Sequence, residues 1–293
     1  MRVLFIYNPS SGQKLEDHKS KYLDYIAQSD ADCDFFEVEP GYGGYDYLME
    51  TEVVYDVIVA IGGDGTVSKT VDAILKRELQ ARLVIIPTGS TNEYAQTLGV
   101  NFESIKASLA LITEGQVRHV DVGILNDVHF TYVAAFGNFT SASYDTPQKW
   151  KNILGHFAYW IYGAVKLHTV KNYNYEVNFN NQTYNETFLF GLISNASQFG
   201  RVFKYKEDEL DIEDGLFEVL LVKKPKKVRD FIQLVQHMLG NEYSGENFIV
   251  GKTDHIKFIS QGKTYTWNID GEKGVRAEIN EIKVLKKKLK VLV

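Results

Sequence analysis

The stretch YDVIVAIGGDGTV, residues 55–67, decides the fold. Its first part, residues 55–61, is a nearly continuous apolar run, which is typical of a parallel strand that is buried on both faces. The run leads directly into the glycine-rich segment 62–66, and we expect a helix from residue 67 to about residue 79. A buried strand, a glycine-rich loop and a helix in immediate succession predict an α/β fold.

Two other stretches repeat this order of strand, polar loop and helix. Residues 2–7 (RVLFIY) precede a cluster of turn residues at 8–12, and residues 83–87 (LVIIP) precede the polar loop 88–93. A further strand is expected at 35–39. Strands that alternate with helices predict right-handed crossovers and a doubly wound parallel sheet, which binds ligands at the carboxyl ends of its strands. All three loops emerge at that edge.

The pattern changes after residue 117 to alternating apolar and polar residues, which predicts an antiparallel β-sandwich. The expected strands are 119–125, 129–135, 175–179, 187–193, 216–222, 255–259 and 263–269. Helices are expected at 151–167 and at 228–239, the second with one apolar face. We therefore divide the chain into a nucleotide-binding α/β domain at 1–124 and a β-rich substrate domain at 125–293, whose last strand is free to return to the first domain.

Composition limits the classes of function. The chain of 293 residues has a net charge of −6 and a pI near 5.7, which argues against nucleic-acid binding. Its one cysteine, Cys33, cannot form an internal disulfide, and the N-terminal apolar run is too short for a signal peptide. The apolar stretch 157–167 is too short to cross a bilayer. These features favour a cytoplasmic protein.

The segment 62–66 has the chemistry of a phosphate-binding loop. Glycines at the start of a helix let backbone N–H groups approach phosphate oxygens, and the helix terminus favours negative charge. Asp64 would be repelled by bare phosphate, so we expect Mg²⁺, brought by a nucleotide, between them. An ordinary Gly-Asp-Gly turn remains the alternative.

The loop 88–93 permits two interpretations. It can line the same nucleotide, or it can be only a helix cap, with Ser90 or Thr91 as the N-cap and Glu93 in the first turn. The loop 8–12 is a weaker indication, because turn clusters commonly follow a first strand. Neither a Walker A sequence nor the protein-kinase motifs occur in the chain. The convergence of three such loops on one sheet edge favours the nucleotide site.

Five separated motifs resemble those of the bacterial diacylglycerol kinase and related lipid kinase family. They are residues 62–66, 87–93, 120–123 (VDVG), 210–216 and 270–272 (DGE), in the same order as in that family. The resemblance covers essentially the whole chain. Residues 135–163 are similar to its Gram-positive branch.

The resemblance implies ATP and Mg²⁺ as cofactors and assigns roles to individual residues. Asp64 and Asp121 would belong to the catalytic magnesium network. Glu272 corresponds to the general base that accepts the proton of the acceptor hydroxyl, with Asp270 in support. The residues implied to bind the nucleotide are Asn8, Pro9, Ser10, Ser11, Gly12, Gly63, Asp64, Gly65, Thr66, Val67, Ser68, Lys69 and Ser90.

A second, structural magnesium site is also implied by the resemblance. It consists of the Asp214 carboxylate and the main-chain carbonyls of Asp211 and Leu216, a ligand set that suits a hard cation. Without the resemblance, the acidic stretch 207–214 reads as a solvated loop.

Two departures from the family pattern lie near the expected phosphates. The family usually has Asn-Glu where this chain has Ser68-Lys69, so a base replaces an acid, and Lys69 either pairs with phosphate or weakens the site. The family aspartate of the second loop is Glu93 here, which is one methylene longer.

The implied substrate is a lipid alcohol, with diacylglycerol first and sphingoid bases or phosphatidylglycerol-like acceptors as alternatives. Such a protein would act as a peripheral protein at the inner membrane face, and a homodimer is compatible with it. Candidate membrane contacts are Trp150, Trp160 and the basic run 223–229, although such clusters are also found in cores and on solvated faces. An NAD kinase-like enzyme and a non-catalytic lipid- or nucleotide-binding protein are the rival functions.

Overall fold

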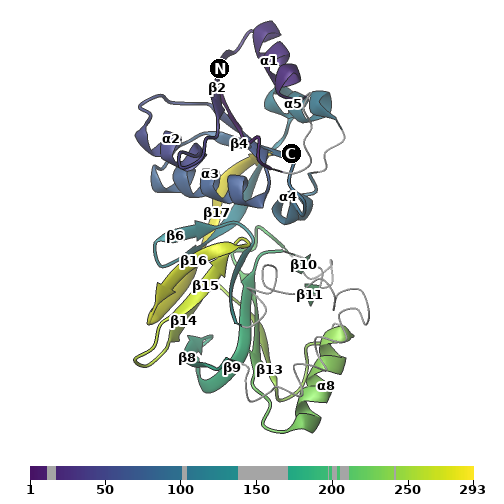
Figure 1. Ribbon diagram of the computed structural model, residues 1–293, viewed down its shortest axis with the longest axis vertical. Coiled ribbons are helices and arrows are strands. Elements are labelled where there is room, and N and C mark those ends of the chain that lie inside the picture. The colour runs from purple at the N-terminus through teal and green to yellow at the C-terminus, as the bar shows by residue number, and fades with distance from the viewer. Residues whose placement is uncertain are drawn as a thin grey trace.

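A computed structural model describes residues 1–11, 18–100, 104–137, 171–196, 198–199, 203–204, 211–240 and 242–293. Figure 1 shows two regions, a helix-rich one that holds both chain ends and a strand-rich one below it. The helix expected at 151–167, the two tryptophans Trp150 and Trp160, and Gly12 lie outside the described residues.

The first region contains the predicted parallel sheet. Its strands are β1 (Arg2–Tyr7), β2 (Asp32–Glu37), β3 (Val57–Gly62) and β4 (Arg82–Pro87), in the spatial order β2-β1-β3-β4. β2 begins earlier than the expected 35–39, because Asp32 already pairs with Arg2 of β1. The strand order reverses between β1 and β3, which is where open α/β sheets bind their ligands.

Helices cover both faces of this sheet, as the doubly wound prediction requires. They are α1 (His18–Gln28), α2 (Gly44–Glu50), α3 (Asp64–Lys76), α4 (Glu93–Thr97) and α5 (Ile105–Glu114). Phe5 and Val59 pack in the cluster with α1 and α5, whereas Leu4 and Ile58 pack with α2, α3 and α4. Successive strand residues point to opposite faces, so a strand buried on both sides must be apolar throughout.

The helix α3 begins at Asp64 rather than at residue 67. Gly63 is its N-cap residue and Asp64 lies in its first turn. An acidic side chain is favourable there, because the helix N-terminus carries partial positive charge. The glycine-rich segment is therefore partly helix, and its backbone N–H groups lie at the free end of that helix.

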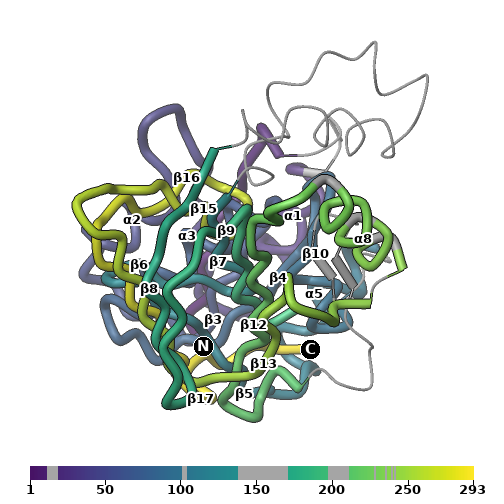
Figure 2. The backbone as a smooth tube through the Cα atoms, turned by 90° about the horizontal axis from the view of Figure 1, so that it is seen from below, coloured from purple at the N-terminus to yellow at the C-terminus, as the bar shows by residue number. Residues whose placement is uncertain are grey.

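The second region is largely antiparallel, as predicted. Its strands are β5 (Val117–Leu125), β6 (Val128–Phe130), β7 (Val133–Gly137), β8 (Tyr173–Phe179), β9 (Gln182–Ser194), β10 (Gln198–Phe199), β11 (Phe203–Lys204), β12 (Phe217–Lys223), β13 (Phe248–Thr253), β14 (His255–Ile259), β15 (Tyr265–Ile269) and β16 (Glu272–Ala277). Figure 2 shows β8, β9, β12 and β13 running beside one another. An aromatic cluster that includes Phe136, Phe258 and the fully buried Trp267 fills the interior.

One expected strand, 129–135, is divided in the structure. β6 ends at Phe130 and β7 begins at Val133. Between them, the backbone N–H groups of Thr131 and Tyr132 donate to a side chain, the carboxylate of Asp270. A side chain that takes these donors replaces a neighbouring strand, which interrupts the ladder.

The two regions are joined by β17 (Ile279–Leu292). It pairs antiparallel with β5 and β14, and near its end Val291 pairs parallel with Leu83 of β4. The ladder with β5 shifts register between Leu285 and Leu289. The α/β region and the β region therefore form one connected set of hydrogen-bonded strands, and the domain boundary near residue 124 stays a prediction.

The helix α8 (Val228–Leu239) has the predicted bounds and the predicted apolar face. Phe231, Leu234 and Met238 are the buried residues of this face.

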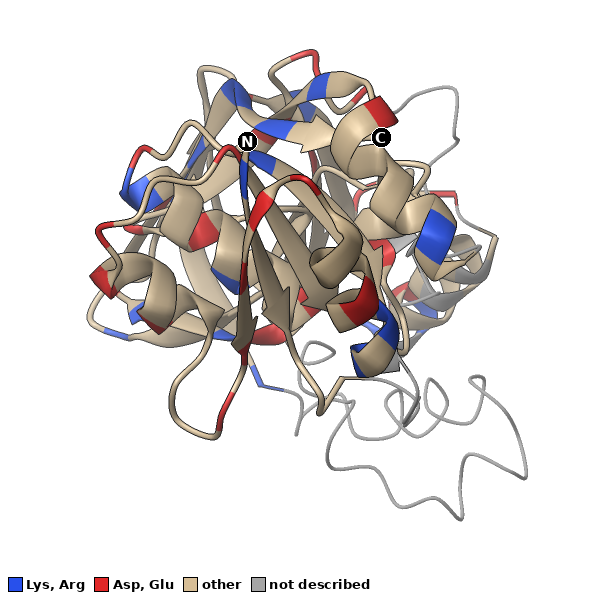
Figure 3. Cartoon of the chain, turned by 90° about the horizontal axis from the view of Figure 1, so that it is seen from above, with Lys and Arg blue, Asp and Glu red and all other residues tan. Residues whose placement is uncertain are grey.

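Figure 3 shows that Lys and Arg residues are interspersed with Asp and Glu residues over the face of the first region that is turned toward the viewer. Within the described ranges, no helix is both long and apolar enough to cross a membrane.

Candidate active site

Hydrogen bonds bring the three predicted loops together at the carboxyl edge of the parallel sheet. Asn8 Nδ2 donates to Thr66 Oγ1 at 2.9 Å, which ties the loop after β1 to the start of α3. The hydroxyls of Ser11 and Thr88 lie 2.9 Å apart, which ties the same loop to the one after β4. Pro9 and Ser10 are exposed beside these contacts. The edge is thus lined by amide and hydroxyl groups.

Two glycines allow the loops after β3 and β4 to touch. A Cβ atom on Gly89 would lie 2.5 Å from Gly63 Cα, so neither loop could approach as closely with a side chain at these positions. Asn92 holds Gly89 on both sides, since its Oδ1 accepts from Gly89 N at 2.9 Å and its Nδ2 donates to Gly89 O at 2.8 Å. The result is a backbone-lined cradle that a Cβ atom would fill, which suits phosphate oxygens.

The helix-cap interpretation of the loop 88–93 is confirmed for Glu93, which lies in the first turn of α4, but is wrong about the N-cap residue. The N-cap position of α4 is Asn92, in the left-handed region at φ 49°, and neither Ser90 nor Thr91 occupies it. Ser90 is exposed, and Thr91 Oγ1 donates to Asp64 Oδ2 at 3.0 Å. The Thr91 hydroxyl group therefore serves the neighbouring loop instead of its own helix.

Asp64 stands at the entrance of the cradle and is partly exposed. Its Oδ1 accepts from the backbone N–H of Tyr94 at 3.2 Å and its Oδ2 from Thr91. Each carboxylate oxygen keeps a lone pair for a metal-bound water, so this donor set fits Mg²⁺ brought with a nucleotide. Among the described residues, no three acidic, His or Cys side chains are grouped closely enough to hold a metal ion directly. The Val67 side chain is buried in the core, so only its backbone can face the cradle.

The Asp-Gly-Glu motif forms a hairpin turn between β15 and β16. Asp270 and Gly271 have φ values of 48° and 82°, a pair of positive angles that matches a type I′ turn and explains the glycine. The turn points Asp270 into the protein, where it is 2% exposed. Glu272, one step further, begins β16 and remains accessible.

The buried Asp270 carboxylate accepts five hydrogen bonds. Oδ1 accepts from the backbone N–H groups of Tyr132 and Val133, both at 3.0 Å. Oδ2 accepts from Thr131 N at 2.8 Å, Thr131 Oγ1 at 2.9 Å and Ser68 Oγ at 2.7 Å. Burial raises the pKa of Asp270, and these bonds oppose that rise. Because all five of these groups donate to the carboxylate oxygens, the arrangement suits the ionised form of Asp270.

Glu272 lies against the first turn of α3. A methyl group on Gly65 would overlap Glu272 Oε1, so the carboxylate reaches the helix only because residue 65 has no side chain. Glu272 Oε2 lies 3.5 Å from Lys69 Nζ on the next turn of the same helix. Ser68 and Lys69, which replace the Asn-Glu of the family pattern, therefore contact the Asp-Gly-Glu turn, each through its side chain.

Tyr132 lies beside Gly271 of the Asp-Gly-Glu turn and was missed in the sequence. It is 3% exposed, and its pKa is raised by burial and then by the charges of Asp270, Asp64, Glu93 and Glu272. Four carboxylates from distant parts of the chain thus act on one tyrosine. Nothing in the alternating pattern around residue 132 distinguishes this tyrosine from a core residue.

Asp121 has a different environment from the other predicted acids. It is fully buried, with Oδ2 accepting from Gly215 N at 2.6 Å and Oδ1 from Lys287 N at 2.7 Å. These bonds hold the turn before β12 and the irregular part of β17. Burial raises the pKa of Asp121, and the hydrogen bonds from the backbone of Lys287 and Gly215 oppose that rise. Its part in a magnesium network stays a prediction.

The expected structural magnesium site contains two lysines. Asp214 Oδ1 accepts from Leu216 N at 2.7 Å, and Asp214 Oδ2 lies 3.6 Å from Lys252 Nζ. Lys286 Nζ donates to the Asp214 carbonyl at 2.8 Å, and Asp211 Oδ1 accepts from the backbone of the same turn. Two ammonium groups therefore lie beside the expected ligands, and the structural magnesium site stays a prediction.

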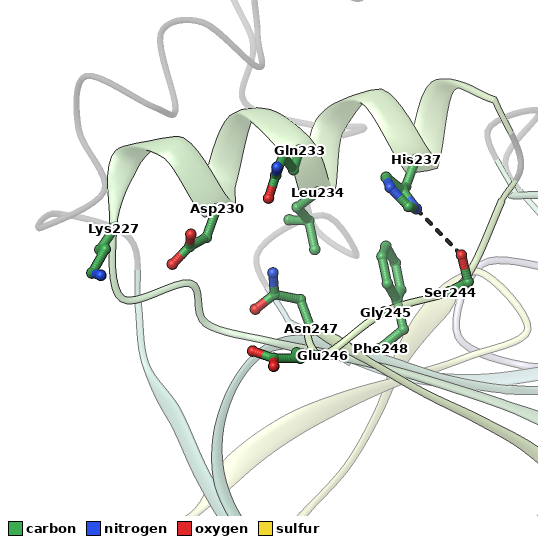
Figure 4. Close-up of a pocket in the computed structure, with 10 residues that line it drawn as sticks. All are labelled: Lys227, Asp230, Gln233, Leu234, His237, Ser244, Gly245, Glu246, Asn247 and Phe248. Carbon is green, nitrogen blue, oxygen red and sulfur yellow. Dashed lines mark hydrogen bonds between the residues drawn. The ribbon is translucent and has the colours of Figure 1, made fainter.

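A separate pocket of about 330 Å³ lies between α8 and the segment before β13. Figure 4 shows that its lining is mostly polar, with Asp230, His237 and Asn247 among the side chains. It is therefore not the apolar cleft that acyl chains would need.

Two lysines of the basic run 223–229 have partners within the protein. Lys223 pairs with Glu186, and Lys224 Nζ donates to Asn172.

Known proteins of one family resemble this chain. The model of the diacylglycerol kinase catalytic domain matches residues 2–125. The diacylglycerol kinase of Bacillus subtilis (strain 168) is 26% identical over 276 residues, which cover 93% of this chain and 90% of that protein. The diacylglycerol kinase of Staphylococcus aureus (strain Newman) is 30% identical over 292 residues, which cover 95% and 88%.

A solved structure, that of a diacylglycerol kinase from Bacillus anthracis str. Sterne, has the same fold, with a TM-score of 0.71 at 21% identity and coverage of 99% of this chain and 96% of that one. The similarity to the two curated relatives extends over nearly all of the chain, including the region beyond residue 125 that carries Glu272. The chain belongs to the diacylglycerol kinase catalytic domain family.

Proposed function

We propose that this protein transfers the terminal phosphoryl group of MgATP to the hydroxyl group of a lipid alcohol, with diacylglycerol as the first candidate. Family membership supports kinase chemistry and ATP as the donor. The relatives that are named diacylglycerol kinases support the acceptor class. Sphingoid bases and phosphatidylglycerol-like lipids are the alternative acceptors.

One observation carries this proposal, namely the position of Glu272 against Gly65 in the first turn of α3. A triphosphate bound at the N-terminus of α3 would place its terminal phosphoryl group next to this carboxylate. An acceptor hydroxyl between the two would then face a proton acceptor on one side and phosphorus on the other. Phosphoryl transfer depends mainly on such positioning and on charge stabilisation.

The reaction is a displacement at phosphorus. The acceptor oxygen forms a new bond to the terminal phosphorus, and the bond from that phosphorus to the bridging oxygen breaks, leaving the electron pair on ADP. The proton of the acceptor hydroxyl passes to Glu272. Asp270 holds the turn that carries Glu272, through the five bonds described above.

The remaining residues of the cradle would bind the donor. Asn8, Thr66 and the backbone around Gly63 would contact phosphate oxygens, and Asp64 would hold Mg²⁺ through water. When bound, Mg²⁺ neutralises part of the phosphate charge. This assignment is supported by the contact between the glycine loops and by the hydrogen bonds that join the three loops.

The acceptor would be drawn from a membrane, so we propose that the protein works as a peripheral protein at the cytoplasmic membrane face. Lys226 and Lys227 are exposed at the start of α8, next to the engaged Lys223 and Lys224. Basic side chains near an anionic surface contribute about 1 kcal/mol each. Sedimentation with anionic vesicles, compared with neutral ones, measures this attraction.

A transfer assay with radiolabelled ATP over lipids in mixed micelles tests the function. We expect label in diacylglycerol or another lipid alcohol, and none in NAD, which serves as the control acceptor for the rival enzyme. In Glu272→Gln we expect transfer to fall by about 10²- to 10⁴-fold, because the proton acceptor is lost. Affinity for an ATP analogue should persist.

The matched control is Glu278→Gln, which changes an exposed acid on the far side of the same hairpin, where its Oε1 accepts from Gly262 N. Its turnover should equal that of the unchanged protein. Full turnover by Glu272→Gln rules out the base assignment. Absence of label from every lipid tested rules out the lipid kinase itself.

A further inference from the structure

Lys69 lies on the side of α3 that faces the Asp-Gly-Glu turn. Gly65, Ser68 and Lys69 are three and four residues apart, so they share one helix face. Gly65 adjoins Glu272, Ser68 Oγ donates to Asp270, and Lys69 Nζ lies 3.5 Å from Glu272 Oε2. The one cationic member of this face is thus beside the proposed base.

The ion pair between Lys69 and Glu272 is weakly held. The two side chains are 61% and 56% exposed, and an exposed ion pair of this kind contributes little to stability. Its separation of 3.5 Å is longer than a good charge-assisted hydrogen bond. The ammonium group can therefore change partners at little cost when a stronger anion arrives.

The surroundings of the site call for such a cation. Asp64, Glu93, Asp270 and Glu272 all raise the pKa of Tyr132, so the site is lined by several carboxyl groups. A triphosphate adds negative charge, and a phosphoryl group in transfer bears such charge on its outer oxygens. Long side chains on a helix lean toward its N-terminus, which brings the Lys69 ammonium group toward the end where phosphate would bind.

We propose that Lys69 is a catalytic residue that leaves Glu272 and binds the terminal phosphoryl group of ATP during transfer. This inference rests on the proposed function. The ammonium group donates hydrogen bonds to the outer phosphoryl oxygens, while Glu272 takes the proton of the acceptor and ADP departs with the electron pair. An acid at position 69, as in the resembling family, could not act in this way.

Substitutions at Lys69 test the proposal against a matched lysine. Lys283 is a suitable control, because its Nζ lies 3.5 Å from Glu281 Oε2 and its side chain is 56% exposed, which closely reproduces the ion pair outside the site. We expect Lys69→Met to lower kcat by about 10²-fold, as the loss of one transition-state donor does. Lys69→Arg should retain most activity, and Lys283→Met should retain all of it.

A binding measurement tests the same contact without turnover. Calorimetric titration with ADP and with the β,γ-imido analogue of ATP separates the terminal phosphate from the rest of the nucleotide. Lys69→Met should weaken the imido analogue by about tenfold, because one charged hydrogen bond is lost, and leave ADP binding unchanged. Lys283→Met should change neither affinity.

Three outcomes overturn the inference. They are a kcat of Lys69→Met equal to that of the unchanged protein, equal loss of ADP and imido-analogue affinity, and full activity of Lys69→Glu. If the unchanged protein labels no lipid, the proposed function fails instead. The calorimetric titrations then still show whether Lys69 binds the terminal phosphate of the nucleotide.

Discussion

Replacement of Asp270 by Asn tests how the structure holds its proposed base. The carboxylate is 2% exposed and accepts from three backbone N–H groups and two hydroxyl groups. Asn keeps one acceptor oxygen and replaces the other by a donor. The best orientation keeps the oxygen toward Tyr132 and Val133, where two N–H groups need it, and turns the NH₂ group toward Thr131 and Ser68.

The energetic cost follows from what each neighbour can do. The hydroxyl groups of Thr131 and Ser68 can rotate and accept a hydrogen bond from the new amide, because a hydroxyl is both donor and acceptor. The backbone N–H of Thr131 cannot, so it is left facing another donor. One buried unsatisfied donor costs about 1–3 kcal/mol, and the two bonds to Tyr132 and Val133 weaken as the charge is lost. We expect Asp270→Asn to lower the free energy of unfolding by about 2–4 kcal/mol.

Urea unfolding followed by tryptophan fluorescence measures this change, since Trp267 is buried in the same region. Asp254→Asn, at an exposed acid in the turn before β14, is the control and should change stability by less than about 0.5 kcal/mol. Ser68→Ala combined with Asp270→Asn should show non-additive losses, because the two residues share a bond. An Asp270→Asn protein as stable as the unchanged one would refute the reasoning.

Two further predictions concern α3. In urea unfolding, Gly65→Ala should leave the free energy of unfolding equal or raise it by about 0.5–1 kcal/mol, because Ala favours a helix. The same change should lower lipid phosphorylation at least tenfold, because the new methyl group displaces Glu272. Unchanged phosphorylation would contradict this prediction. For Asp72, burial raises the pKa of the carboxyl group, but hydrogen bonds from His129 and Lys76 lower this pKa by more than burial raises it. The pKa in the folded protein therefore lies below the ordinary value. The ionised Asp72 therefore stabilises the fold above about pH 4, and this stabilisation is lost as the pH falls through the folded pKa. In acid titrations of stability, Asp72→Asn should lower the free energy of unfolding by about 2 kcal/mol at neutral pH and by much less near pH 2. A cost that does not depend on pH would contradict this prediction.

Local patterns explain why much of the fold could be predicted. Three of the four parallel strands, β1, β3 and β4, are short apolar runs, and the structure places all four strands within a few residues of the expected bounds. The helix α8 shows its apolar face in the sequence and has the expected ends. Where the boundaries differ, pairing with a neighbour decides, as at Asp32 in β2.

The sequence also indicated which residues belong near phosphate, but not what their side chains contact. Ser68 and Lys69 were expected to face the nucleotide, whereas in the structure they contact Asp270 and Glu272. In one of the two interpretations of the loop after β4, Ser90 or Thr91 was the N-cap residue, yet Asn92 takes that position. These contacts depend on the path of residues that are far away in the chain.

By itself, the sequence determined where strands end, where glycines permit close approach and which order of motifs the chain carries, because burial and turn chemistry act over a few residues. Only the tertiary structure decided that a hairpin 202 residues beyond Ser68 returns to the same helix, and that Tyr132 lies among four carboxylates. The physical reason is that the strand pairing of β17 and the hydrogen bonds of the buried Asp270 carboxylate fix one region against the other. Neither kind of contact produces a periodic pattern in the sequence of the residues that make it.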